Sequence, residues 1–207
     1  MTLLVVFELI GTVAFAVSGS MAGLDKNMDL FGVTVLGVTT AVGGGVVRDL
    51  VLGVLPPSVF QHPFLALTAF AVSLIVFLPG TRNIFRRRDH VCRQALLVMD
   101  AAGLGSFTVV GVQAACTTSP GAGILLAVFV GVITGVGGGI LRDILSGITP
   151  VVFVRHFYAC ASIAGGLLCA LIWNGVGRAS AMALGAALTF TLRLLAIRYR
   201  WNLPKAH

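Results

Sequence analysis

The sequence predicts an all-α integral membrane protein with seven transmembrane helices, built as an inverted three-plus-three repeat followed by a seventh helix. Three observations predict this fold: the composition, a series of long apolar segments, and a glycine-rich motif that occurs twice. Of the 207 residues, 57% are hydrophobic and only 10% are charged, whereas a soluble domain carries about 25% charged residues. We therefore expect one transmembrane domain that covers residues 1–207.

Seven segments are long and apolar enough to cross a bilayer core, which needs roughly 20 apolar residues per helix. The first begins at Met1 and continues past the length of a signal-peptide core, so it is interpreted as a retained span. Pro63 and Pro79 bracket the third, one at the start of the helix and one just after its end. In chain order the segments are Thr2–Gly23, Leu30–Leu52, Pro63–Leu78, Arg93–Ala114, Gly121–Leu145, Val154–Trp173 and Ser180–Ile197.

Lysine and arginine predict the orientation, because cytoplasmic loops carry an excess of both. The loop between the third and fourth segments has five arginines within residues 82–93, and further basic residues follow the seventh segment. Counting spans from this loop places the N-terminus outside and the C-terminus in the cytoplasm. Arg178 is the one basic residue in a predicted external loop. This distribution explains the net charge of +7 as contact with anionic lipid headgroups, so nucleic acid is not expected as a partner.

The motif Gly-Gly-Gly-x-x-Arg-Asp occurs at residues 43–49 and again 94 residues later, at 137–143. Flanking matches extend the similarity, so that repeat one covers about 1–80 and repeat two about 93–175, with the seventh helix at about 180–197. Each repeat holds an odd number of spans, so the two must be inverted relative to each other in the membrane. Many channels and transporters have this architecture, with their pathway at the interface between the repeats.

Apart from residues near segment ends, such as Arg93 and Arg193, which are grouped with the basic loop and the basic tail, six charged residues lie inside apolar segments, and the repeat relates them in pairs. Isolated, each would cost about 2.5–3.5 kcal/mol at a helix centre. Residues i and i+1 do not face each other on a helix, so each arginine is expected to find its acidic partner on another helix. Two interpretations stay open: salt bridges that only lock helices together, or charges that line or gate a hydrated route, which is favoured. The pairs are Glu8 with Asp100, Arg48 with Arg142, and Asp49 with Asp143.

The two glycine triplets predict an unwound or kinked point near the middle of the second and fifth helices. Three consecutive glycines exceed what close packing needs, whereas glycines such as Gly19 and Gly111 are expected to serve packing alone. Carbonyl oxygens freed at such a break would coordinate a transient monovalent cation or a small zwitterion. Neighbouring threonines would add hydroxyl ligands, or else bond back to their own helix. The residues are Gly43, Gly44, Gly45, Gly137, Gly138 and Gly139, with Thr40 and Thr134.

The doubled motif, the seven spans and the inverted repeat resemble the bacterial branch of the trimeric intracellular cation (TRIC) channel family, over essentially the whole chain. The resemblance implies a homotrimer in the bacterial inner membrane, surrounded by lipid, with a pore in each subunit that conducts K⁺ and, less selectively, Na⁺. The triplets would form the constriction and Arg48 and Arg142 would gate it. The four acidic residues of the pairs would set the local field.

Animal members of that family carry a lysine-centred motif that binds phosphoinositide, and this chain lacks it, so that regulation is not expected here. Neither enzymatic activity nor a resident metal or cofactor is expected. Related bacterial sequences are also catalogued as glycine transporters. A secondary carrier of glycine or another small amino acid is therefore the alternative function.

Overall fold

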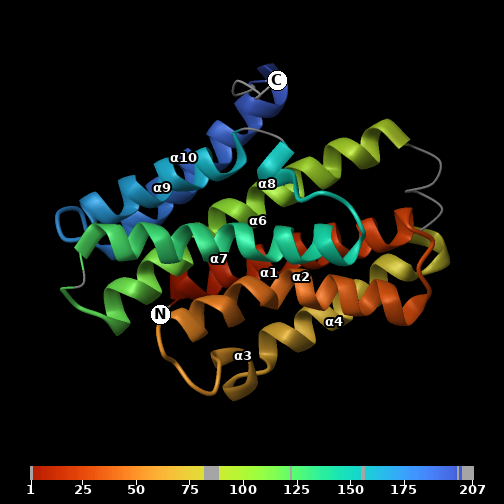
Figure 1. The fold of residues 1–207 in the computed structure, drawn as a ribbon, viewed down its shortest axis with the longest axis horizontal. Helices are drawn as coiled ribbons and strands as arrows, with labels where there is room; N and C mark the ends of the chain where they lie inside the picture. Colours follow the sequence, from red (N-terminus) through yellow and green to blue (C-terminus); the bar gives the residue numbers. More distant parts are fainter. Residues whose placement is uncertain (1, 82–88, 122, 155–156, 200, 202–207) are drawn as a thin grey trace.

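The computed structural model describes residues 2–81, 89–121, 123–154, 157–199 and 201, and over these ranges it is all-helical. In Figure 1 the long helices lie roughly side by side, and the turns that join them gather at two opposite ends of the molecule. The helices are α1 (Thr2–Asp25), α2 (Leu30–Val51), α3 (Ser58–Gln61), α4 (Phe64–Phe77), α6 (Asp89–Thr118), α7 (Gly123–Leu145), α8 (Val151–Val154), α9 (Tyr158–Ile172) and α10 (Arg178–Tyr199).

Five of these helices, α1, α2, α6, α7 and α10, are long and apolar enough to cross a membrane. Helices α4 and α9 are apolar but have only 14 and 15 residues, about 21 and 22 Å at 1.5 Å per residue. That is less than the roughly 30 Å of a bilayer core, so the count of seven spans stays a prediction. Several of the basic residues that support the predicted orientation lie outside the described residues: Arg82, Arg86, Arg87, Arg88, Arg200 and Lys205.

Helices α2 and α7 end in the same way. Gly53 and Gly147 adopt positive φ angles of 70° and 67°, and the N–H of the following residue donates to the carbonyl of Asp49 at 2.8 Å or of Asp143 at 3.0 Å. This is the Schellman motif, in which glycine takes the left-handed conformation without a steric penalty. In both places it redirects the chain into a four-residue helix, α3 or α8.

Both glycine triplets lie inside continuous α-helix, so the prediction of an unwound point is wrong, and a bend of the helix axis stays a prediction. The contacts give the physical reason. A Cβ atom on Gly44 would collide with the carbonyl oxygen of Thr134, and one on Gly138 with that of Thr40. These reciprocal contacts show that α2 and α7 run antiparallel and touch backbone against backbone. The triplets therefore allow the closest approach of two helices, a packing use that we had expected only of other glycines.

The other glycines do serve packing, as expected. A Cβ on Gly19 would lie 2.5 Å from the hydroxyl of Thr40, and one on Gly111 would lie 2.5 Å from that of Thr134. Helix α1 therefore packs on α2 in the way that α6 packs on α7. Between α1 and α6, the rings of Phe15 and Phe107 meet with centroids 5.3 Å apart.

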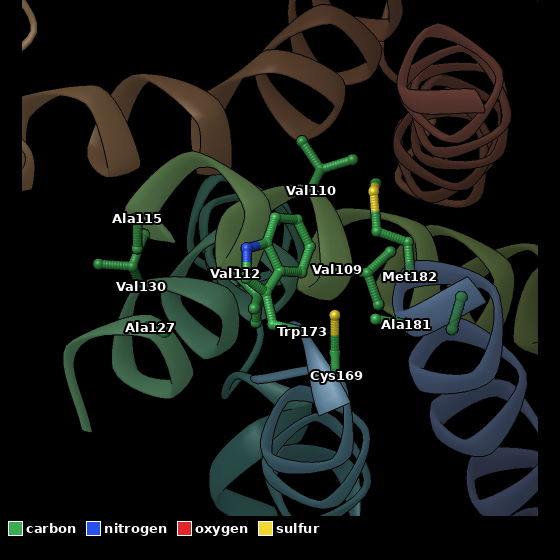
Figure 2. Close-up of a cluster of buried hydrophobic side chains, with 11 residues drawn as sticks. Val109, Val110, Val112, Ala115, Ala127, Val130, Cys169, Trp173, Ala181 and Met182 are labelled. Atoms are coloured by element: carbon green, nitrogen blue, oxygen red, sulfur yellow. The ribbon is translucent and has the colours of Figure 1, made fainter. Parts of the chain in front are cut away.

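A separate apolar cluster attaches α9 and α10 to α6 and α7. Figure 2 shows the indole of Trp173 among the side chains of Val109, Val112 and Cys169, with Met182 of α10 nearby. All of these side chains are buried. This cluster holds α9 and α10 against the part of the chain that carries the second motif.

The α2–α7 crossing can be tested inside one triplet. We expect Gly44→Ala to lower the free energy of unfolding by about 2 kcal/mol, because its methyl group would force two backbones apart. Gly45→Ala is the matched control, because the nearest atom to its Cβ would be Nη2 of Arg48, 3.9 Å away. It should raise the free energy of unfolding by at most about 1 kcal/mol, since alanine has a higher helix propensity than glycine. Denaturation of the detergent-solubilised protein, followed by circular dichroism, measures both. Equal destabilisation by the two substitutions would contradict the backbone contact.

Candidate functional site

The two Arg-Asp pairs lie one turn beyond the crossing of α2 and α7, toward opposite ends of the molecule, because these helices run antiparallel. All four side chains are buried: Arg48 is 9% exposed, Asp49 3%, Arg142 4% and Asp143 1%. Each pair therefore has to be compensated inside the protein.

At the end of α2, Arg48 donates through Nε to Oδ1 of its neighbour Asp49 at 2.8 Å, and through Nη2 to the hydroxyl of Ser58 at 3.1 Å. The second carboxylate oxygen of Asp49 accepts both the backbone N–H of Ser58 at 2.7 Å and its hydroxyl at 2.6 Å. The pair therefore closes on itself and holds the first residue of α3.

The prediction that Arg48 cannot neutralise Asp49 is wrong, and the same holds for Arg142 and Asp143, which are 2.9 Å apart. The rule that residues i and i+1 point apart concerns the directions of their Cα–Cβ bonds. The arginine side chain is long enough to bring its guanidinium group back beside the next carboxylate. Here the chain also folds back to supply the remaining hydrogen bonds of the aspartate.

At the end of α7, Arg142 reaches further than its counterpart. Nη1 donates to Oδ1 of Asp100 on α6 at 2.7 Å and to the hydroxyl of Ser18 on α1 at 2.5 Å. The hydroxyl of Tyr158 on α9 donates to the same oxygen of Asp100 at 3.2 Å. Asp143 accepts the backbone N–H of Val151 at 2.8 Å, at the first residue of α8. Arg142 therefore finds an acidic partner on another helix, as expected of each arginine, and this site joins α1, α6, α7 and α9.

The α2 site lacks these cross-links. Glu8 is the counterpart of Asp100 in the sequence repeat. It is half-buried and interacts electrostatically with Arg48, but within the described residues no ion pair joins Glu8 to Arg48. The repeat offsets of 92 and 94 residues match Ser18 with Val110 and Tyr158 with Phe64. Neither hydrocarbon side chain can hydrogen-bond. Of two nearly identical motifs, the Arg142 copy is thus cross-linked to other helices, whereas the Arg48 copy is bonded only to residues close to it in the chain.

Our sequence interpretation missed Ser18, Ser58, Tyr158 and Arg193. Arg193 was grouped with the basic tail, yet it is 3% exposed, and its guanidinium carbon lies 4.6 Å from the ring centroid of Tyr158, a cation–π contact. A signal was present: the small residues Gly185 and Thr189 precede it at helical spacing and mark a buried face.

A cavity of about 220 Å³ lies beside Arg142. Its lining balances three acidic against three basic side chains, so it suits a zwitterion better than an ion of either sign. The hydroxyls of Thr40 and Thr134, both fully buried, each donate to a carbonyl of their own helix at 2.6 Å. They therefore bond back to their own helix rather than point toward a ligand, which is one of the two alternatives that the sequence left open. No group of three potential metal ligands occurs within the described part of the chain. The charged lining residues are Asp25, Lys26, Asp100, Arg142, Asp143 and Arg193.

Known proteins resemble this chain along nearly its whole length. The family model described as "Glycine transporter" matches residues 5–79 and 97–174. The inner membrane protein YadS of Escherichia coli K12, of the UPF0126 group, is 38% identical over 95% of this chain and 93% of its own. A UPF0126 membrane protein of Deinococcus radiodurans is 39% identical over 95% of this chain and 89% of its own.

Solved structures agree. A TRIC cation channel studied for the basis of its conductance is 38% identical, with a TM-score of 0.85 over 98% of this chain and 96% of its own. The TRIC orthologue from Rhodobacter sphaeroides is 33% identical, with a TM-score of 0.87 over 97% of this chain and 100% of its own. The chain belongs to the TRIC family. The resemblance inferred from the doubled motif is thereby confirmed. A more distant TRIC channel from C. elegans, 15% identical with a TM-score of 0.64 over 93% of this chain and 90% of its own, shares the fold.

The difference between the two ends of this TRIC chain predicts unequal costs of neutralising its acidic residues. Asp100→Asn removes the charge that faces buried Arg142, and we expect it to cost about 3 kcal/mol of stability. Glu8→Gln, at the matching position of the other repeat, should cost less than about 1 kcal/mol, because no ion pair is broken. Unfolding of the detergent-solubilised variants, with wild type alongside, gives both values. Similar costs for the two variants would mean that the ends are equally cross-linked.

Proposed function

We propose that this chain is a cation channel of the bacterial inner membrane that assembles as a homotrimer, with a K⁺-permeable pore in each subunit. The observation that carries the proposal is the presence of buried, repeat-related Arg-Asp pairs one turn to either side of the α2–α7 crossing. Buried ionisable groups at membrane depth mark ion pathways by default. The similarity to TRIC cation channels and to an inner membrane protein supports it.

The crossing acts as the closed constriction in this proposal. At Gly44 and Gly138 the backbones of α2 and α7 meet directly, while the side chain of Leu141 lies against Gly43 and the ring of Phe15 against Gly138. A small separation of the helices would therefore open a gap lined in part by peptide groups. The carbonyl groups of Thr40 and Thr134, which face Gly138 and Gly44, then turn toward a passing cation. Carbonyl oxygens replace the water of a dehydrated monovalent cation in such filters.

The arginines act as the gate. While Arg48 and Arg142 pair with the neighbouring aspartates, the guanidinium charges offset the carboxylates that would attract a cation. Displacement of an arginine leaves a negative site at that end of the route. The seven spans, the inverted repeats and an orientation with the N-terminus outside and the C-terminus in the cytoplasm belong to the same proposal.

A carrier of glycine or another small amino acid is the second candidate, and one observation favours it. The cavity of about 220 Å³ beside Arg142 combines both signs of charge. A small zwitterion would place its carboxylate toward Arg142 or Arg193 and its ammonium group toward Asp100. The description of the matching family model points the same way.

Arginine neutralisation tests the gate. Arg48→Gln and Arg142→Gln should each change open probability or unitary conductance severalfold in planar bilayers with symmetric KCl, because each frees a carboxylate from its counter-charge. Arg142→Lys keeps the charge and controls for lost folding. Arg198→Gln, at an exposed position of α10, should leave the currents unchanged. Unaltered currents in both Arg48→Gln and Arg142→Gln would refute the gating role.

Liposomes distinguish channel from carrier. Purified protein in vesicles should give unitary K⁺ currents without saturable uptake of labelled glycine. Saturable uptake with no unitary current, abolished by Asp100→Asn but not by Glu8→Gln, would instead establish the carrier.

A further inference from the structure

A second and larger cavity, of about 620 Å³, lies where the turn between α6 and α7 meets the turn between α9 and α10. It opens at the beginning of α7, nineteen residues before Arg142, which is about 28 Å along the helix. It is therefore distinct from the charged cavity, and the function proposed above makes no use of it.

The lining of this cavity changes from polar to apolar with depth. Thr117, Asn174 and Arg178 lie at the helix ends, whereas Leu126 lies three residues inside α7 and Ala170 two residues inside α9. Trp173 also lines it, and behind this residue lies the buried cluster in Figure 2, which gives the cavity a packed apolar floor. A volume of this size is typical of small-molecule sites.

The charge of the lining is positive. Arg178 is the one charged side chain among the described lining residues, and no carboxylate of the described chain forms an ion pair with it. The first turns of α7 and α10 contain no acidic residue, so the partial positive charge at these helix ends is not offset there. Arg178 is also the residue that the positive-inside pattern left unexplained.

We propose that this cavity binds an amphiphile with one anionic group, whose head pairs with Arg178 and whose short apolar chain lies against Leu126 and Trp173. A guanidinium group binds carboxylate or phosphate oxygens in a bidentate way. Two sources share this chemistry: the headgroup region of an anionic membrane lipid, and a free medium-chain carboxylate. The site does not depend on whether the protein conducts ions.

Tryptophan fluorescence tests the site, because the chain has only two tryptophans. Trp201→Phe leaves Trp173 as the single reporter. Titration of this variant in phosphatidylcholine nanodiscs with octanoate should change the Trp173 emission in a saturable way. Octylamine and 1-octanol, which have the same chain but no negative charge, should give no saturable change.

Substitution of Arg178 in the same background is the decisive comparison. Arg178→Gln should weaken octanoate binding at least tenfold, and Arg178→Lys should recover most of it. Arg198→Gln is the matched control, since it removes an exposed arginine from the other end of the same helix. Equal affinity in the Arg178→Gln and Arg198→Gln variants, or saturable binding of 1-octanol, would overturn the proposal.

Cys116 offers a second measurement that needs no substitution, because it lines the cavity and Arg178 acts on its thiol electrostatically. Octanoate should slow its modification by N-ethylmaleimide at least threefold, as read by mass spectrometry of the Cys116 peptide. No protection of Cys116 at saturating octanoate would count against the site.

The lipid composition of the nanodiscs identifies the source. With phosphatidylglycerol added, at high salt to screen the surface potential, a lipid occupant should weaken octanoate binding at least threefold. Unchanged octanoate affinity would assign the site to a free carboxylate. Either result keeps the anionic site and fixes its natural occupant.

Discussion

The contact between the backbones of α2 and α7 constrains the rest of the molecule. Gly44 lies against the carbonyl of Thr134 and Gly138 against that of Thr40, so at these two glycines no side chain separates the two backbones. Arg48 and Arg142 follow four residues later in each helix, about 6 Å along the axis. The charges are thus held close to the buried crossing and must be compensated inside the protein. The Schellman turns and the short helices α3 and α8 return the chain to provide that compensation.

The two ends satisfy this demand by different means. Arg142 draws acceptors from α1 and α6 in addition to its own neighbour, whereas Arg48 is satisfied by Asp49 and Ser58, ten residues away in the chain at most. Local contacts can break without moving a long helix, and segments held only by such contacts are the first to open. We therefore expect the Arg48 end to open more readily than the Arg142 end, whose contacts link several helices.

Sequence patterns predicted what depends on composition and periodicity. The all-helical class and the long apolar segments followed from the composition, and an acidic partner for Arg142 on another helix followed from the cost of charge in hydrocarbon. The identity of that partner, Asp100, did not. Pairing within Arg48–Asp49 did not, because it depends on how the chain returns at Ser58. The glycine triplets show the same limit. Absence of a Cβ permits either a bend or a close approach, and only the surface of the facing helix decides between them.

Helix α10 shows how one element outside the repeat changes the symmetry within it. It lies beyond the two ranges that the family model matches, 5–79 and 97–174, yet it contributes Arg193 to the cavity beside Arg142. The cation–π contact of Arg193 with Tyr158, which itself bonds Asp100, links α10 to the acidic partner of Arg142. A third cation at one end only must shift the electrostatic potential there relative to the Arg48 end. The asymmetry of the two motif copies is therefore imposed by the last helix as well as by Ser18 and Tyr158.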